Sequence, residues 1–486
     1  MSEEIRNLKP QALWENFYKL TQVPRPSKHE DAIQAFMMEF GENLGLETFK
    51  DEVGNIIIKK PATPGMEGKK GVILQAHLDM VPQKNSGTDH NFETDPIDTF
   101  IDGDWVKARG TTLGSDNGIG AAAAMAVLQD KAMVHGPVEG LFTSDEETGM
   151  TGANGLIAGL LDGDILMNLD SEDEGDLYIG CAGGVDTVGV FNYTEEAVFA
   201  NAAAFKISVS GLKGGHSGLD IHLGRGNANQ IMNGLLMEAA DKFGLRLAGV
   251  DGGSLRNAIP RESFSVIVVP EANKDAFLAF AADYEKENQA TFKEADPGLQ
   301  IEVESTTMPG SVIDEASTKG LYRAVDKCPN GVIAFDKNMP DVVETSTNLA
   351  VVKSNDGVIE MASLQRSAVD ADKDKIAKVI FDVFTEAGAR AENSGDYPGW
   401  KPNVDSAILK EMKEVYNNKY GKVPAVKVIH AGLECGILGS AYPDWDMISF
   451  GPTIRNPHSP AEMVNIPTVA MFWDYLVETL KNIPAK

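Results

Sequence analysis

Acidic residues, with one histidine, gather at four places in the first 175 residues of the chain. His77 and Asp79 lie in QAHLDMVP, and Asp116 lies in GTTLGSDNGIG. TSDEETG holds Asp145–Glu147, and MNLDSEDEG holds Asp170. Grouped carboxylates repel one another unless cations neutralise them, and imidazole with carboxylate is a ligand set for zinc and similar metals. If the fold brings these places together, they predict a divalent-metal site.

Each place also has an ordinary structural explanation when it is taken alone. Asp116 would serve as a helix N-cap, Glu146 and Glu147 as a solvated turn, and His77 as a buried core histidine. Four such places, each at the end of a predicted strand or the start of a predicted helix, are harder to explain in this way than one. Their combination favours the metal site.

The elements that must position these side chains are predicted strands. The apolar runs at 71–80, 138–147 and 163–172 each end in acidic residues, and a Gly-Ala-rich helix is expected at about 119–133. In an open α/β sheet the ligand crevice lies beyond the carboxyl ends of the strands. We therefore expect the acidic clusters to converge at one edge of a mixed central sheet flanked by helices.

The pattern changes after about Ala203, where strands are expected at 204–212, 263–270, 299–306 and 357–365. Amphipathic segments are expected at about 229–243, 274–287 and 373–387. A turn-rich stretch at 393–403 precedes the return of helix and strand patterns. The predicted fold class is α/β, with an inserted α+β domain. We assign residues 1–186 and 397–486 to a catalytic metal-binding domain and residues 187–396 to the insertion. No internal repeat is visible in the sequence.

Composition excludes several classes of partner. The net charge of −29 over 486 residues repels phosphate backbones and anionic lipid, so neither nucleic acid nor a membrane is expected as a partner. The N-terminus has acidic residues where an export signal would be basic and then apolar, which predicts a cytoplasmic protein.

The three cysteines are scattered and are expected to be buried. His29, His90 and His135 are expected at the surface.

Several motifs together resemble metallopeptidase family M20, and most closely its aminoacylhistidine dipeptidase branch. They are QAHLDMVP, GTTLGSDNGIG, TSDEETG, MNLDSED, GLKGGHSG, LRNAIPRE and GPTIRNPHSPAE, and the resemblance runs essentially from end to end. It implies a zinc-exopeptidase-like catalytic domain with a lid and dimerisation domain inserted into it. Asn117 directly follows Asp116, and the resemblance implies an asparagine at this position in the aminoacylhistidine branch. Its presence argues against the tripeptidase and carboxypeptidase branches.

The resemblance also implies a ligand set for two divalent metal ions. His77 and Asp170 would bind one metal, Glu147 and His458 the other, and Asp116 would bridge them. Zinc is the expected metal, and Co²⁺ or Mn²⁺ would also suit these ligands.

Two further residues would then act beside the metals. Asp79 would orient and polarise His77, and Glu146 would be the general base that takes a proton from the bridging water. A water shared by two cations still needs a separate carboxylate to carry its proton, and adjacent Glu146 and Glu147 fit the two jobs.

The inserted domain would supply the remaining site residues. His216 has a family counterpart that stabilises the oxyanion, in several members from across a dimer interface. Asn257 and Arg366 would fix the carbonyl and the terminal carboxylate of the substrate, and His430, with Glu434, would line the substrate pocket. The structural alternatives are that Arg366 is a surface strand residue and that Asn257 only holds a turn.

The implied activity is hydrolysis of small unblocked dipeptides, preferentially Xaa-His, by a cytoplasmic homodimer joined through the lid. Another M20 amide hydrolase, such as an aminoacylase, a deacetylase or a broader di- or tripeptidase, would share the same metal residues. A non-catalytic metal-stabilised binding protein is the alternative of a different class. The presence of Glu146 argues against it, because packing alone does not need this residue.

Overall fold

The computed structural model describes residues 3–486, and the chain divides into two compact units. Unit 1 comprises residues 1–180, 400–428 and 433–486, of which 1 and 2 are not described. Unit 2 comprises residues 181–399 and 429–432. Unit 2 is therefore inserted into unit 1, and each is described separately below. In the described residues, no helix combines the length and the apolar character needed to span a membrane.

Unit 1 is built around an eight-stranded mixed sheet with the order β1-β2-β6-β3-β7-β23-β8-β22. Its central strands β6, β3, β7 and β23 run parallel, whereas β1 and β2 are antiparallel additions at one edge. Strands β3, β6 and β7 are buried along their whole length, as the continuous apolar runs predicted. In sheet order the strand bounds are Glu47–Lys50, Ile56–Lys60, Val138–Thr143, Val72–His77, Ile165–Asn168, Asp446–Ser449, Asp176–Cys181 and Ala425–Ile429.

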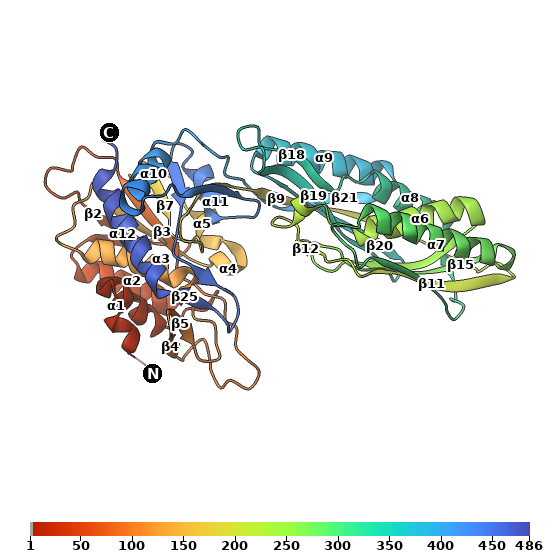
Figure 1. The fold of residues 1–486 in the computed structure, drawn as a ribbon, viewed down its shortest axis with the longest axis horizontal. Helices are drawn as coiled ribbons and strands as arrows, with labels where there is room; N and C mark the ends of the chain where they lie inside the picture. The colour runs from red at the N-terminus through yellow and green to blue at the C-terminus, as the bar shows by residue number, and fades with distance from the viewer. Residues whose placement is uncertain (1–2) are drawn as a thin grey trace. The chain divides into compact units, whose positions relative to one another are not determined.

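Helices pack against this sheet, and α3 (Ser115–Gln129) lies closest to its centre (Figure 1). Almost all residues of α3 are buried, and its run of alanines and glycines allows close approach to β3, β6 and α1. The other helices of unit 1 are η1 (Glu4–Asn7), α1 (Gln11–Thr21), α2 (Asp31–Asn43), α4 (Glu146–Gly149), α5 (Thr151–Gly155), α10 (Ala407–Tyr420), α11 (Glu434–Ala441) and α12 (Ile466–Asn482).

A small sheet of four strands accompanies the central one and brings the C-terminal motif into unit 1. Its order is β24-β25-β5-β4, with bounds Ile454–Arg455, Met463–Asn465, Trp105–Ala108 and Thr99–Asp102. The pairing of β25 with β5 fixes the loop that carries His458 and Glu462, because that loop lies between β24 and β25.

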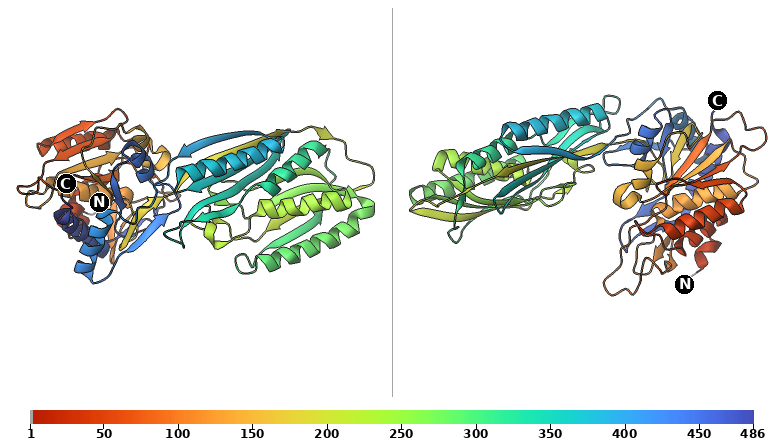
Figure 2. Two further views of the ribbon diagram at one scale, coloured as in Figure 1. Left: turned by 90° about the horizontal axis from the view of Figure 1, so that it is seen from above. Right: turned by 180° about the vertical axis from the view of Figure 1, so that it is seen from behind.

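Unit 2 is a nine-stranded antiparallel sheet with the order β16-β11-β15-β13-β19-β20-β9-β21, and β18 also pairs with β19. Helices α6, α7, α8 and α9 cover one face of it (Figure 2, left). In chain order the strands are Gly183–Asn192 (β9), Ala202–Ser210 (β11), Arg246–Gly252 (β13), Ser263–Pro270 (β15), Gln300–Ser305 (β16), Gly331–Phe335 (β18), Val343–Asn355 (β19), Val358–Ser367 (β20) and Arg390–Tyr397 (β21). The helices are Ala228–Phe243 (α6), Lys274–Thr291 (α7), Glu315–Lys327 (α8) and Asp370–Glu386 (α9).

Short pieces complete unit 2. Strands β12 (Gly215–His216) and β14 (Ala258–Ile259) pair with each other, as do β10 (Glu195–Glu196) and β17 (Val312–Ile313). The single turns η2 (Ile221–Leu223) and η3 (Glu271–Asn273) follow β12 and β15.

The sheet of unit 2 contains the same topology twice, although the sequence shows no internal repeat. In the first module the chain order is β11-α6-β13-β15-α7-β16. Its strands lie in the sheet in the order β16-β11-β15-β13, so the module's fourth strand is at the edge, followed by its first, third and second strands. In the second module the chain order is β9-α8-β19-β20-α9-β21. Counted from the opposite edge of the sheet, its strands lie in the order β21-β9-β20-β19, which is again the fourth, first, third and second strand of the module. The first module is inserted between the first strand and the first helix of the second.

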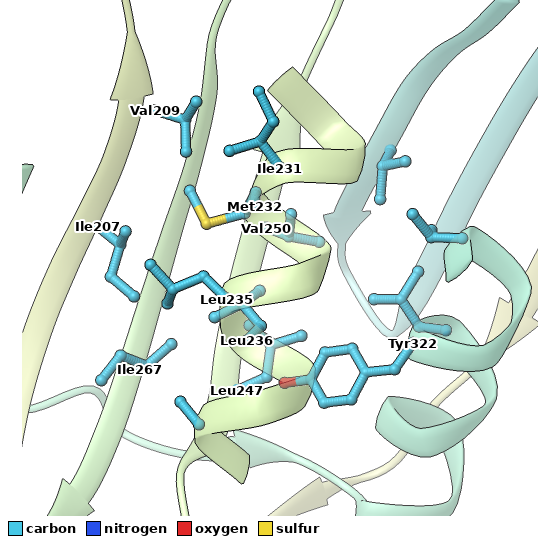
Figure 3. Close-up of a cluster of buried hydrophobic side chains, with 14 of the residues drawn as sticks. Ile207, Val209, Ile231, Met232, Leu235, Leu236, Leu247, Val250, Ile267 and Tyr322 are labelled. Atoms are coloured by element: carbon cyan, nitrogen blue, oxygen red, sulfur yellow. The ribbon is translucent and has the colours of Figure 1, made fainter. Parts of the chain in front are cut away.

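One hydrophobic core runs under both modules. It joins Phe205 of β11 and Leu235 of α6 to Leu321 of α8 and Phe384 of α9, all of them buried. Figure 3 shows part of it, with the side chain of Tyr322 on α8 directed toward the apolar face of α6. The amphipathic segments expected at 229–243, 274–287 and 373–387 form α6, α7 and α9.

Two expectations from the sequence are wrong. His135 is fully buried, its Nδ1 lies 2.6 Å from the Gly136 carbonyl oxygen, and hydrogen bonds with the Thr63 hydroxyl hold its backbone N–H and carbonyl. The stretch at 393–403 is not all turn, since β21 extends to Tyr397 by pairing with β9. The three cysteines are buried, as expected.

Candidate metal centre

Two triads of potential metal ligands lie at the carboxyl ends of the parallel strands of unit 1. The first is His77, Asp116 and Asp170, and the second is Asp116, Glu147 and His458. His77 ends β3, Glu147 follows β6, Asp170 follows β7 and Asp116 lies in the first turn of α3. The strand ends therefore bring together the residues that the sequence placed after separate apolar runs, as the rule for open α/β sheets requires.

Asp116 belongs to both triads, and each of its oxygens faces a different histidine. Its Oδ1 lies 3.1 Å from His77 Nε2, and its Oδ2 lies 3.2 Å from His458 Nε2. Asp170 Oδ1 lies 3.5 Å from His77 Nε2, and Glu147 Oε2 lies 3.0 Å from His458 Nε2. This is the arrangement of a carboxylate that bridges two neighbouring cations.

These spacings fit divalent-metal coordination. Two ligand atoms at about 2.0–2.1 Å from a tetrahedral zinc ion are roughly 3.3 Å apart, which is close to the separations found in both triads. Nitrogen and carboxylate oxygen donors of this kind suit zinc, and they also accept cobalt or manganese. The donor set and its geometry therefore fit two divalent cations.

The electrostatics point the same way. Burial raises the pKa of Asp170 to about 7, and the carboxylates of Asp116 and Glu147 add to the rise against the opposing effect of His77. Hydrogen bonds with Asp116 and Glu147 raise the pKa of His458 to about 11. Protons thus compensate a surplus of buried negative charge, and divalent cations bound between the same atoms would compensate it instead.

Asp79 links His77, a candidate metal ligand, to the turn that carries the two glutamates. His77 Nδ1 lies 3.3 Å from Asp79 Oδ1, so a proton on Nδ1 leaves Nε2 free to face the two aspartates. Asp79 also accepts hydrogen bonds from the backbone N–H groups of Glu146 (3.0 Å) and Glu147 (3.2 Å). Asp79 is fully buried, which raises its pKa, but the hydrogen bond and charge of His77, with the hydrogen bonds from Ser27 and the Glu146 N–H, hold that pKa at about 2.

Glu146 lies beside both triads and shares a possible ligand group with His77 and Glu147. Burial raises its pKa above the ordinary value, and the carboxylates of Asp170, Glu434 and Glu147 raise it further against the opposing charge of His77. A raised carboxyl pKa suits a group that must accept a proton and later release it. Asp145, with φ 56°, makes the sharp turn between β6 and α4 that presents Glu146 and Glu147.

Glu462 and Arg25 hold the loop that carries Asp116. The Glu462 carboxylate accepts the backbone N–H groups of residues 113, 114, 115 and 116 at 2.7, 2.8, 2.7 and 3.2 Å, and the Ser115 hydroxyl at 2.6 Å. Arg25 donates to the carbonyls of Leu78 (2.8 Å), Asp79 (3.0 Å) and Gly114. Gly114 has φ 70° and no room for a side chain, because a Cβ would lie 2.6 Å from Arg25 Nη2.

In unit 2, Arg366, His216 and His430 form a separate cluster, which we call the recognition cluster. Arg366 is buried, and its guanidinium donates to the Tyr397 hydroxyl at 2.9 Å and to Ser217 Oγ at 3.4 Å. This placement contradicts the alternative of a surface strand residue. Burial and the nearby Arg366 charge lower the pKa of both histidines, that of His430 to about 3.

His216 is held in one tautomer by its own loop. Its Nδ1 accepts the backbone N–H groups of Gly218 at 3.1 Å and Leu219 at 3.0 Å. The proton of the neutral ring is therefore on Nε2, which makes that atom a hydrogen-bond donor. Asn257 lies on the adjoining turn, where its side chain is exposed and its carbonyl accepts the Ser217 N–H at 2.8 Å.

The family model for "Peptidase family M20/M25/M40" matches residues 73–482, which is most of the chain. The chain belongs to peptidase family M20. The M20 chain is 45% identical over 483 residues to the cytosol non-specific dipeptidase of Escherichia coli, and the alignment covers 99% of this chain and 100% of the relative.

Solved structures agree with the assignment to the M20 family. The aminoacylhistidine dipeptidase of Vibrio alginolyticus matches with a TM-score of 0.96 and 47% identity, covering 100% of this chain and 99% of that one. Aminopeptidase PepT of Bacillus cereus matches with a TM-score of 0.60 and 17% identity, covering 98% of this chain and 99% of that one. The second match shows a shared fold.

Some residues of the M20 chain that shape the site were not identified from its sequence. Arg25 and Ser27 lie in the connection between α1 and α2, and Ser27 Oγ donates to Asp79 Oδ2 at 2.7 Å. Asn117 was singled out in the sequence only as a feature of the branch, whereas its Nδ2 donates to Asp170 Oδ1 and so helps to hold a candidate ligand. Glu462 stands four residues after His458 within GPTIRNPHSPAE. Its place in that motif was the only feature of the sequence that could have indicated a role for it at the site.

Proposed function

We propose that this chain hydrolyses unblocked dipeptides, with Xaa-His dipeptides preferred, at a centre of two divalent cations. The observation that carries the proposal is the position of Asp116, whose two oxygens face His77 and His458 in separate ligand triads. The names of the relatives support the substrate class, since one is a non-specific dipeptidase and one an aminoacylhistidine dipeptidase. The two names differ in breadth, and a substrate panel must decide between them.

His77 and Asp170 would hold one cation, Glu147 and His458 the other, and Asp116 both. Zinc is the metal we propose, with Co²⁺ or Mn²⁺ as functional substitutes. When bound, two such cations lower the pKa of a water molecule and polarise the carbonyl that is to be cleaved. Asp79 keeps the His77 ring in the orientation and tautomer that the ligand role requires.

Glu146 moves the proton. Its carboxylate takes a proton from the attacking water and delivers it to the amine that leaves when the peptide bond breaks. The backbone hydrogen bonds from Glu146 and Glu147 to Asp79 fix the turn on which both side chains stand. One glutamate can therefore bind metal while its neighbour stays free for proton transfer.

The recognition cluster would bind the substrate and the developing charge. His216 would donate from Nε2 to the oxyanion, Arg366 would pair with the terminal carboxylate, and Asn257 and His430 would contact the rest of the dipeptide. In this proposal unit 2 is the lid, the protein forms a homodimer through it, and the enzyme works in the cytosol, as the name of the Escherichia coli relative suggests.

The test is hydrolysis of β-Ala-His, Gly-His, Leu-Leu and N-acetyl-His by the intact protein, before and after chelation and after zinc, manganese or cobalt is restored. We expect metal-dependent cleavage of the free dipeptides, with the His-containing ones fastest, and no cleavage of N-acetyl-His. Cleavage of N-acetyl-His alone would identify an aminoacylase or deacetylase. Absence of any cleavage in the metal-loaded protein would favour the non-catalytic binding protein.

A further inference from the structure

Arg366 on β20 and Tyr397 on β21 lie in one row of the unit 2 sheet, on either side of β9. Both pair with Gly184 of β9, so their side chains stand on the same face of the sheet. Neighbouring strands are about 4.8 Å apart, which separates the two outer backbones by roughly 10 Å. Arg366 Nη1 nevertheless donates to the Tyr397 hydroxyl at 2.9 Å. The two side chains therefore meet above the middle strand.

Gly184 makes this contact possible because it has no side chain. A Cβ at this position would lie 2.6 Å from Tyr397 Oη and 2.7 Å from two carbons of its ring. Gly184 does not have a positive φ, so the space above its backbone, and not the backbone conformation, requires glycine. A glycine inside a strand often marks such a close approach.

A bulge in β21 brings Tyr397 to this position. Ser394 pairs with Asp186 and Tyr397 pairs with Gly184, so three steps along β21 match two steps along β9. A β-bulge redirects the side chains that follow it and is common next to functional sites. Without the extra residue, Asp396 would stand opposite Gly184 in place of Tyr397.

The backbone around Tyr397 is fastened to the start of α9. Lys373 is 3% exposed, and its Nζ donates to the Tyr397 carbonyl at 2.9 Å. The same ammonium group forms ion pairs with Asp370 (3.3 Å) and Asp396 (2.5 Å). The Gly399 N–H donates to Asp370 at 2.9 Å. The Tyr397 ring therefore extends from a fixed backbone.

The Arg366 guanidinium keeps donors free for a ligand. It is 5% exposed, and two of its five N–H groups are used, by Ser217 Oγ at 3.4 Å and by the Tyr397 hydroxyl. Within residues 3–486 it forms no ion pair, so its buried positive charge lacks an anion. One hydrogen on Nη1 and two on Nη2 remain, which is enough for two parallel bonds to a carboxylate.

We propose that Tyr397 is a positioning residue, whose hydroxyl holds the Arg366 guanidinium in the orientation that binds the terminal carboxylate of the dipeptide. This inference rests on the proposed function, in which Arg366 binds that carboxylate. A planar fork binds a carboxylate through two bonds only when both N–H groups face both oxygens. The hydroxyl is an uncharged acceptor, so it fixes this orientation and leaves the positive charge for the substrate. A carboxylate at the same place, such as that of Asp396, would pair with the guanidinium itself.

Steady-state kinetics of Tyr397→Phe test the positioning role, because this change removes the hydroxyl and keeps the ring over Gly184. We expect KM for Gly-His to rise by about tenfold, the effect of roughly one hydrogen bond to a charged group, with little change in kcat. In an Arg366→Met background, Tyr397→Phe should change kcat/KM by less than about twofold, because no guanidinium is left to position. An unchanged KM in the single variant, or equal effects of Tyr397→Phe in both backgrounds, would overturn the proposal.

Tyr284→Phe is the matched control for these measurements. It removes a hydroxyl of unit 2 that donates to the Ile231 carbonyl at 3.0 Å, within the first module. We expect it to leave KM unchanged. A rise in KM equal to that of Tyr397→Phe would attribute the effect to a general loosening of unit 2 and would also overturn the proposal.

Crystal structures of wild type and Tyr397→Phe without a dipeptide give a result that does not depend on activity. We expect the Arg366 guanidinium to leave its wild-type position in the variant. A guanidinium that stays in place would refute the positioning role, whatever the kinetics. A displaced guanidinium, together with a metal-loaded wild type that cleaves no dipeptide, would refute the proposed function alone.

Discussion

Replacing Glu462 with glutamine tests whether the metal centre depends on the carboxylate that holds the Asp116 loop. Glu462 is 2% exposed and accepts five hydrogen bonds of 2.6–3.2 Å, two at Oε2 and three at Oε1. Glutamine has one acceptor oxygen, so Glu462→Gln loses at least two of these bonds and turns an NH₂ group toward backbone N–H donors.

The magnitude follows from those bonds. Hydrogen bonds to a charged group contribute about 1.5–3 kcal/mol each, so two of them amount to roughly 3–6 kcal/mol. We expect part of this loss to lower the unfolding free energy, and part to release Asp116 from its bridging position. Loss of the groups that orient metal ligands typically weakens metal binding by about 10- to 100-fold, and we expect a decrease of that size for zinc.

The assay is competition for zinc between the metal-free protein and a chromogenic chelator, with thermal unfolding measured in parallel. Glu139→Gln is the matched control. Glu139 is 5% exposed and accepts the backbone N–H groups of Asp162 (3.0 Å) and Gly163 (2.7 Å), in the same unit but away from the ligand triads. Glu139→Gln should lower the unfolding temperature and leave zinc affinity unchanged. If both variants lost the same zinc affinity, or neither lost any, the positioning role of Glu462 would be refuted.

Three further predictions follow from the site. Asp116→Ala removes a ligand from both triads, so both zinc equivalents should be lost together in metal analysis, and one tightly retained ion per chain would contradict the bridge. Arg366→Lys replaces a planar fork with a point charge, so KM for dipeptides should rise at least about tenfold with little change in kcat, and dipeptide amides, which lack the carboxylate, should be unaffected. His430 has a folded pKa of about 3, below the ordinary 6.5, so the unfolded chain binds its proton first and stability is lost as pH falls from 6.5 toward 3. This loss amounts to about 3 kcal/mol by pH 4, and urea unfolding should show it in wild type but not in His430→Gln.

Four of the candidate ligands could be placed from the sequence because their signal is local. They lie at the end of a buried strand or at the start of a helix, and the geometry of parallel strands brings such positions to one edge. His458 lies in the loop between β24 and β25, and only the resemblance of GPTIRNPHSPAE indicated it. The groups that hold the ligands were not predictable in this way. Glu462 bonds to backbone N–H groups about 350 residues earlier in the chain, and Arg25 to carbonyls more than 50 residues later, so no spacing in the sequence records either contact.

The strands of unit 2 were harder to predict because several polar residues are buried there. Strand β19 carries Thr345, Ser346, Thr347 and Asn348 in succession, all of them nearly inaccessible to solvent. Their partners are distant in sequence, such as Pro329 O for Thr347 Oγ1 (2.6 Å) and Ala258 O for Asn348 Nδ2 (2.8 Å), so a polar run that resembles a loop is a central strand. Helix α8 had a recognisable start, since Asp314 accepts the Ser317 N–H at 2.8 Å as an N-cap. The repeated module is visible only in the strand order.

In the proposed mechanism, two bound cations and the Glu146 carboxylate together cleave the dipeptide. The most direct measurement compares the zinc content and the kcat for Gly-His of Glu146→Gln with those of wild type, both loaded with metal. We predict two zinc ions per chain in both proteins and a kcat lower by about 10²- to 10⁴-fold in the variant, because only the proton carrier is removed. A kcat near that of wild type, with both metals bound, would show that Glu146 is not the group that transfers the proton.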